Sequence, residues 1–160
     1  MKNYTELLKS ELIMALGCTE PISIALAAAK AREVLGVIPS KIEVKCSGNI
    51  IKNVKGVTVP NTNGMKGVEA ATAIGTVAGD SCLGLEVLSK VTDEDIKAAK
   101  DLMAKDIITV SLKEGVENLD IEIVADDDNG NTVDVEIKNK HTNIVKVTKN
   151  DEVIHIDNCY

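Results

Sequence analysis

Aromatic side chains and arginine are scarce in this sequence. Its 160 residues include no Phe, no Trp and two Tyr, and Arg32 is the single arginine. Nucleic-acid binding usually relies on aromatic stacking and on the planar guanidinium group, so we expect no nucleic-acid partner. The formal net charge of −7 agrees with this and favours solubility. Because 44% of the residues are hydrophobic, we expect one domain with a core of Ile, Val, Leu and Ala.

Long apolar segments and cysteine pairs are missing as well. No apolar run approaches the roughly 20 residues that span a bilayer, and no basic segment precedes an apolar run at the N-terminus. We therefore expect a cytoplasmic protein that does not enter a membrane. The four cysteines, Cys18, Cys46, Cys82 and Cys159, form no CxxC motif, which argues against a zinc ribbon or a thioredoxin-type pair. In a reducing compartment they should be free thiols.

Most of the first half has helical patterns. Helices are predicted over 5–16, 20–35, 67–79 and 92–105, from apolar spacing, small side chains and helix-start signals. Thr19 should cap the second of these helices and Gly36 should end it, while Thr92 should cap the fourth. Alternating residues predict a strand over 41–46, and many turn-forming residues predict a loop over 47–64.

The second half changes to the two-residue period of β-strands. Alternating apolar residues predict strands over 107–112, 119–124, 133–137, 144–147 and 153–156. Asn129–Gly130 predicts a type I′ hairpin turn, and residues 149–152 predict another turn. The acidic stretch 126–130 is interpreted as a solvated hairpin tip, because it lacks the ligand spacing of a calcium loop. We expect an α+β single domain with two or three helices packed on one face of a mostly antiparallel sheet.

Cys18 lies between two predicted helices, directly before the one that begins near Glu20. A helix start carries unpaired N–H groups and a partial positive charge. These groups stabilise a thiolate, and they can also hold a carboxylate. The alternative is that Cys18 is a small apolar residue buried between helices, as most free cysteines are. Spacing alone does not separate the two hypotheses.

Two short polar segments flank predicted strands. Ser47, Gly48 and Asn49 follow the strand over 41–46, and His141, Thr142 and Asn143 precede the strand over 144–147. Strand ends are where ligands tend to bind in layered α/β folds, and the amides and hydroxyls of the first segment could orient an amino acid. The alternatives are an ordinary turn for the first segment and a structural or exposed histidine for the second.

Three stretches, GCTEPISIALAAAKA (17–31), KCSGNIIKNVKGVTVPNT (45–62) and HTNIV (141–145), occur in this order. Together they resemble the amino-terminal part of the iron–sulfur L-cysteine desulfidases, a family grouped with the bacterial iron–sulfur L-serine dehydratases. The similarity runs from about residue 5 to residue 148. GCTEP and SGNIIKN are specific in combination, whereas HTNIV alone is a weak motif.

The resemblance implies a lyase that removes sulfide from L-cysteine and leaves an aminoacrylate, which breaks down to pyruvate and ammonia. The family's cofactor is a 4Fe–4S cluster with one iron open to substrate, which acts as a Lewis acid on the leaving group. Cys18 matches the family's motif cysteine and would be either the third cluster ligand or the thiolate base at Cα; we favour the ligand. Thr19 and Glu20 would hold the substrate carboxylate and ammonium, respectively. The outer walls would be Ser47, Gly48, Asn49, His141, Thr142 and Asn143.

The resemblance also bears on partners. Chains of this family continue into a helical domain that supplies further cluster cysteines, and we find no such segment before Tyr160. We therefore expect a carboxy-terminal cluster-bearing domain or subunit as partner, a small amino-acid substrate, and no activity of this chain alone; a homodimer is left open. The alternatives are a non-catalytic, amino-acid-binding regulatory module and part of an iron–sulfur L-serine dehydratase.

Overall fold

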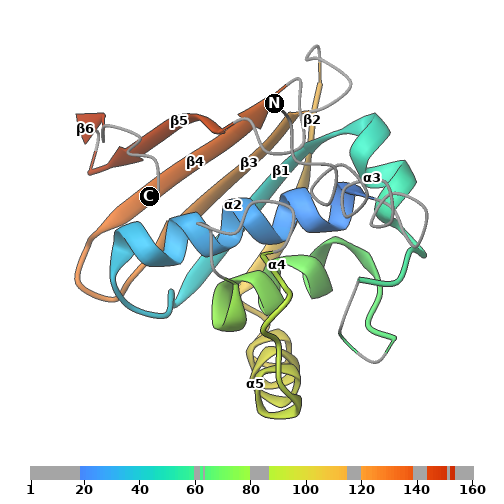
Figure 1. The fold of residues 1–160 in the computed structure, drawn as a ribbon. Coiled ribbons are helices and arrows are strands. Elements are labelled where there is room, and N and C mark those ends of the chain that lie inside the picture. Colours follow the sequence, from blue (N-terminus) through green and yellow to red (C-terminus); the bar gives the residue numbers. More distant parts are fainter. Residues whose placement is uncertain are drawn as a thin grey trace, which may run out of the picture.

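The described helices lie on one face and at one end of a six-stranded sheet (Figure 1). The computed structural model describes residues 19–59, 62, 64–79, 87–114, 120–138, 144–150 and 152–153. Its elements follow the chain in the order α2 (Thr19–Leu35), β1 (Lys41–Ser47), α3 (Gly48–Val54), α4 (Gly67–Ala78), α5 (Asp93–Ala104), β2 (Ile108–Lys113), β3 (Asp120–Asp126), β4 (Thr132–Lys138), β5 (Ile144–Lys149) and β6 (Glu152–Val153). This arrangement confirms the predicted α+β single domain.

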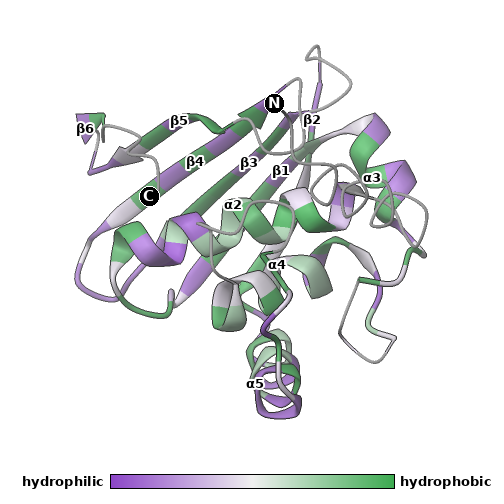
Figure 2. Cartoon of the chain, in the orientation of Figure 1, coloured by the Kyte–Doolittle hydropathy of each residue, from purple (hydrophilic) through white to green (hydrophobic). Residues whose placement is uncertain are grey.

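The sheet has the strand order β2-β1-β3-β4-β5-β6. β1 and β2 are parallel and the other neighbours are antiparallel, which confirms the predicted mostly antiparallel sheet. Hydrophobic and hydrophilic residues alternate along β3 and β4 (Figure 2), so each strand has one apolar face. Ile121, Ile123, Val133 and Val135 on that face are fully buried, and α2 packs on both strands. The core therefore lies between the sheet and the helices, and it is built of aliphatic residues.

α2 is buried on nearly every side because its residues are small and apolar. Every residue from Pro21 to Ala29 is buried, as expected of a helix without a polar face. α2 also packs on α4, and the two backbones nearly touch at Gly75, where an added Cβ would lie 2.3 Å from the Ala25 carbonyl oxygen. Arg32 Nε donates a hydrogen bond of 3.1 Å to the Thr76 carbonyl and links the same two helices.

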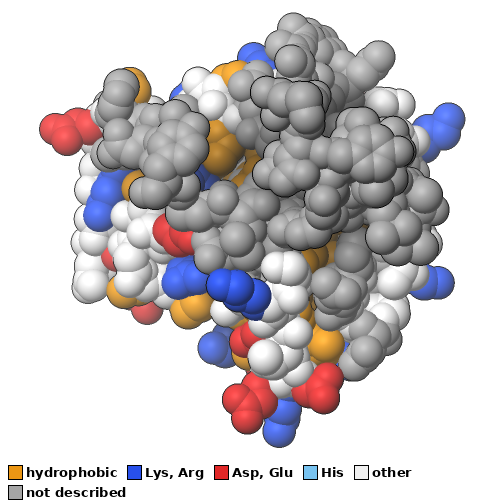
Figure 3. Space-filling model, viewed as in Figure 1, with side chains coloured by type: hydrophobic (Ala, Val, Ile, Leu, Met, Phe, Trp, Pro, Cys, Tyr) orange, Lys and Arg blue, Asp and Glu red, His pale blue; other side chains and the backbone are white. Residues whose placement is uncertain are grey.

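The predicted start of α5 is confirmed. Thr92 Oγ1 accepts a hydrogen bond of 3.2 Å from the Asp95 N–H, and Asp95 Oδ2 accepts one of 3.0 Å from the Thr92 N–H. This reciprocal pair is a capping box. α5 packs on α4, and its hydrophilic side faces away from α4, where acidic and lysine side chains gather (Figures 2 and 3).

The ends of α2 agree with the prediction to within one residue. The helix begins at Thr19, one residue before the predicted start. Gly36 ends it with a φ of 85°, and its N–H donates to the Arg32 carbonyl at 2.8 Å. The predicted helix over 5–16 and residues 154–156 of the last predicted strand lie outside the described residues. No helix in the described part of the chain is both long and apolar enough to cross a membrane.

The predicted loop over 47–64 is wrong in its first half, because residues 48–54 form α3. Ser47 caps this helix: its Oγ accepts a hydrogen bond of 3.4 Å from the Ile50 N–H. Ile50 and Val54, one helical turn apart, are both buried. Capping and this apolar spacing outweigh the turn preference of Gly48 and Asn49.

The hairpin between β3 and β4 is confirmed, but its predicted turn type is wrong. A type I′ turn requires positive φ at both central residues, and of the predicted pair only Gly130 has one, at 84°. Asp127 Oδ1 instead accepts hydrogen bonds from the N–H groups of Asn129, at 2.8 Å, and Asn131, at 2.9 Å. These bonds hold a longer loop over 127–131, which the dipeptide alone does not reveal.

Candidate functional site

One end of the sheet brings together segments that are far apart in the sequence. β1 ends at Ser47 and α3 follows directly. α3 packs against α2, and the first turn of α2 lies beside it (Figure 1). The start of α2, which bears Thr19 and Glu20, and the start of α3 therefore lie at the same end of the molecule.

Strand pairing shows which other strand ends lie at this end of the sheet. Ser47 pairs with Lys113 at the end of β2, and Asp120 at the start of β3 pairs with Lys138 at the end of β4. β1 and β4 are two strand positions apart, which corresponds to about 10 Å. The end of β4 thus lies within reach of a small molecule held near Ser47.

Several predicted site residues fall outside this description. Cys18, His141, Thr142 and Asn143 lie outside the described residues, and Thr19 is described only as the first residue of α2. The described elements next to them, the start of α2, the end of β4 and the start of β5, lie at the end of the sheet that carries Ser47. The neighbours of the undescribed segments are therefore brought together, which the sequence could not show.

The described candidate residues differ in their exposure to solvent. Ser47 is buried and its hydroxyl caps α3, so it shapes the helix start. Gly48 and Asn49 are exposed, and Glu20 is half-buried in the first turn of α2. A Cβ at Gly48 would meet only Leu112 Cδ1, at an ordinary 3.5 Å, so sterics do not demand glycine there. Asn49, with an amide that both donates and accepts, is the best-presented ligand group of its segment.

The described residues do not provide ligands for an iron–sulfur cluster. No group of three or more His, Cys, Asp or Glu side chains within the described ranges could hold a metal ion. Cys46, the one cysteine among them, is fully buried. Burial and, secondarily, the charge of Asp120 raise the pKa of its thiol to about 12, so it stays protonated. Cys46 is therefore a core residue of β1.

A charged cluster on the sheet face opposite α2 was not predicted. Lys113 Nζ lies 3.2 Å from Asp120 Oδ1 and 3.2 Å from Glu122 Oε1, and it also donates to Glu136 Oε2. Burial acts to lower the pKa of Lys113, but the hydrogen bonds to Glu136 and Asp120 outweigh it and raise that pKa. One lysine thus holds three carboxylates on β3 and β4. The acids at every second position of these strands were the signal in the sequence.

The same cluster contains an interacting pair of carboxyl groups, Glu122 and Asp134. Lys146 Nζ lies 3.2 Å from Glu122 Oε2 and 3.2 Å from Asp134 Oδ2. Burial would raise the pKa of Glu122, but the hydrogen bond with Asp134 and the charge of Lys113 lower it to about 2. Burial and the neighbouring Glu122 raise the pKa of Asp134 to about 6. Lysines occupy the space between these acids, so the cluster stabilises the sheet and does not form an open binding site.

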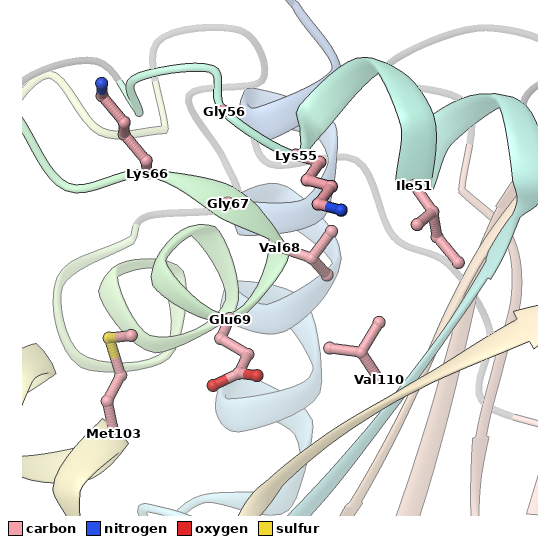
Figure 4. Close-up of a pocket in the computed structure, with 9 residues that line it drawn as sticks. All are labelled: Ile51, Lys55, Gly56, Lys66, Gly67, Val68, Glu69, Met103 and Val110. Atoms are coloured by element: carbon pink, nitrogen blue, oxygen red, sulfur yellow. The ribbon is translucent and has the colours of Figure 1, made fainter.

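A separate pocket of about 400 Å³ opens between α3, the start of α4 and β2 (Figure 4). Its apolar walls are Ile51, Val68, Met103 and Val110. Lys55, Lys66 and Glu69 add charges, and Gly56 and Gly67 complete the lining. Sequence reasoning missed this pocket because its walls come from elements that pack together only in the folded chain.

The chain is similar to several longer bacterial proteins. It is 91% identical over 160 residues to a UPF0597 protein of Finegoldia magna, and the match covers 100% of this chain and 38% of the relative. A UPF0597 protein of Treponema denticola is 48% identical over 153 residues, which are 96% of this chain and 35% of the relative. One of Parabacteroides distasonis is 49% identical over 149 residues, which are 93% and 34%.

The chain therefore spans little more than a third of the length of the curated relatives it matches. The name UPF0597 states no activity. No protein-family model matches the chain, and no solved structure matches it.

Proposed function

We propose that this chain is the substrate-binding, amino-terminal part of an iron–sulfur L-cysteine desulfidase. The observation that carries the proposal is the meeting of two motif segments at one end of the sheet. The start of α2, from the GCTEP motif, lies beside α3, from the SGNIIKN motif. The strand ends next to the HTNIV segment lie at that end as well.

The proposed reaction divides into substrate binding and elimination. L-cysteine loses a proton from Cα and sulfide from Cβ, which gives 2-aminoacrylate; hydrolysis then gives pyruvate and ammonia. The positive end of the 17-residue helix α2 favours the substrate carboxylate, next to Thr19. The Glu20 carboxylate, in the same turn, would attract the ammonium group. The exposed amide of Asn49 would complete this binding shell from α3.

The 4Fe–4S cluster and its partner domain belong to the proposal as well. The described residues offer no set of cluster ligands, so sulfide departure is assigned to groups outside them. Cys18 is the one motif cysteine of this chain with a proposed role, as cluster ligand or as base at Cα. The extra length of the relatives leaves room for a carboxy-terminal cluster-bearing domain. A cytoplasmic location is part of the same proposal.

A non-catalytic amino-acid-binding module is the second candidate. One observation favours it: the described residues at this end of the sheet supply groups that bind, and no described thiol is reactive. A binding module does not need a thiol before α2, so it should tolerate Cys18→Ser. An enzyme should lose turnover on this change, whether Cys18 is a ligand or a base.

The test uses a full-length hybrid, in which this sequence replaces the matching 160 residues of the Finegoldia magna relative. The hybrid is reconstituted anaerobically with iron and sulfide. Sulfide release from L-cysteine and pyruvate release from L-serine are then measured. We expect sulfide release from cysteine to be the preferred reaction and Cys18→Ser to reduce it at least ~100-fold, as loss of an essential catalytic group does. Cys46→Ala, a change at a core thiol, is the matched control and should keep turnover.

Each other outcome has a defined meaning. A preference for serine over cysteine would show that the enzyme is a serine dehydratase and not a desulfidase. Normal turnover of Cys18→Ser would remove both proposed roles of Cys18. Binding of cysteine without turnover of either substrate would favour the regulatory module.

A further inference from the structure

We propose that the pocket between α3 and α4 is a second ligand site, which binds a small aliphatic amino acid as its zwitterion. The site is distinct from the proposed catalytic end. Lys55 directly follows α3, whereas Asn49 lies in its first turn, so the two residues are separated by the length of the helix, about 9 Å. The inference does not rest on the proposed function.

The size and walls of the pocket suit such a ligand. Its volume of about 400 Å³ lies in the lower part of the range of small-molecule sites. Val68 and Val110, from α4 and β2, form an apolar surface together with Ile51 of α3 (Figure 4). A short aliphatic side chain can bury itself against this surface, whereas a nucleotide-sized cofactor would need aromatic or wider walls that are absent from the lining.

Two exposed side chains of opposite charge, Lys55 and Glu69, flank this apolar surface. Figure 4 shows the Lys55 ammonium between Ile51 and Val68, and the Glu69 carboxylate on the other side of Val68. Lys66 points away from the pocket. Among the residues that the structure describes, neither the Lys55 ammonium nor the Glu69 carboxylate has a hydrogen-bond or ion-pair partner. A ligand carboxylate can pair with Lys55 and a ligand ammonium with Glu69, which is the charge pattern of a zwitterion.

The rim of the pocket is held in place by backbone bonds. Thr58 and Lys66 form an antiparallel bridge, and the Gly67 N–H donates to the Val57 carbonyl at 3.3 Å. Gly56 and Gly67 have φ values of 136° and 94°, and a Cβ on either would meet no atom within 4 Å. The hollow therefore exists before a ligand enters.

The test is a titration of the 160-residue chain with L-valine, followed through backbone amide NMR signals. L-valine has no β leaving group, so it cannot undergo elimination. We expect saturable shifts at Gly56, Gly67 and Val68. 3-Methylbutanoate and isobutylamine, which each lack one charge of valine, should bind at least ~10-fold more weakly, because each leaves one charged partner unmatched.

Variants that remove one charge distinguish binding in this pocket from a general effect of the chain's charge. Lys55→Met and Glu69→Gln should each weaken L-valine binding at least ~10-fold. Lys52→Met on α3 and Glu94→Gln on α5 change exposed charges outside the pocket lining and should leave binding unchanged. All four substitutions are at exposed positions, and thermal unfolding by circular dichroism checks that they fold.

Three results would overturn the proposal. These are the absence of saturable shifts with L-valine, equal affinity for 3-methylbutanoate and valine, and equal weakening by Lys52→Met and Lys55→Met. The proposed function can fail without affecting these results, because its test measures turnover and replaces Cys18. Loss of valine binding, in turn, leaves the turnover test intact.

Discussion

Replacing Gly75 with Ala tests the packing that positions α2 and, with it, the GCTEP segment. A Cβ at Gly75 would lie 2.3 Å from the carbonyl oxygen and 2.6 Å from the Cα of Ala25. Both are backbone atoms of α2, so they cannot turn aside as a flexible side chain would. To reach ordinary contact the two helices must separate by about 1 Å, in a core that is otherwise closely packed.

The magnitude follows from two opposing effects. Overpacking of a core usually costs about 1–3 kcal/mol, and more where backbone must move. Ala gains about 1 kcal/mol over Gly in a helix interior. Because the contact is with backbone, we place the overpacking cost at or above the upper value. We therefore expect a net loss of about 2–3 kcal/mol in the free energy of unfolding, or about 4–12 °C in Tm for a chain of this size.

The assay is urea unfolding of the 160-residue chain, followed by circular dichroism. Gly48→Ala is the matched control, because its Cβ would make only an ordinary contact of 3.5 Å and Gly48 has no positive φ. The control should stay within about 0.5 kcal/mol of the original chain. If Gly75→Ala proved as stable as the original chain, α2 and α4 could not be in the close contact described.

The charged cluster yields two further predictions. Asp134→Asn should remove a pH dependence of the free energy of unfolding. The pKa of the Asp134 carboxyl is raised to about 6 in the folded chain. The protonated carboxyl therefore contributes stability below the unfolded pKa near 4, and this contribution is lost as the pH rises through 6. The variant should therefore gain about 1–2 kcal/mol over the original chain between pH 4.5 and pH 7, measured as urea midpoints, and a constant difference would contradict the raised pKa. Lys113→Met leaves Asp120, Glu122 and Glu136 without their shared cation, and should cost about 3 kcal/mol at pH 7. Lys45→Met, which breaks an exposed pair with Glu43 at 3.5 Å, should cost under about 1 kcal/mol, and equal losses would show that the cluster is not central to stability.

Much of the fold was predictable because its signals are local. The alternation of apolar and polar residues along β3 and β4 predicts both the strands and their buried face. The Thr92–Asp95 pair marks the start of α5. α3 was missed since Gly48 and Asn49 favour turns, while the evidence for a helix was the spacing of two apolar residues in a seven-residue element. The turn at Asn129–Gly130 was misassigned because the hydrogen bonds of Asp127 decide it.

The candidate residues could be chosen from the sequence, but their arrangement in space could not. The motif residues could be selected from the sequence, but the contact between α2 and α3 depends on how the helices cross the sheet. The burial of Asp120 and Glu122 depends on strand register, which pairs them with Lys138 and Glu136. The pocket beside Lys55 depends on the approach of α4 to α3 and β2.

The most direct test of the proposed function is the KM for L-cysteine of the reconstituted full-length hybrid with Asn49→Asp, compared with Asn53→Asp. Both residues are exposed on α3, one helical turn apart, so the two variants share the same added charge. Asn49→Asp should repel the substrate carboxylate and raise KM at least ~10-fold with little change in kcat, whereas Asn53→Asp should leave KM within about two-fold. Equal KM values for the two variants would contradict substrate binding at the start of α3.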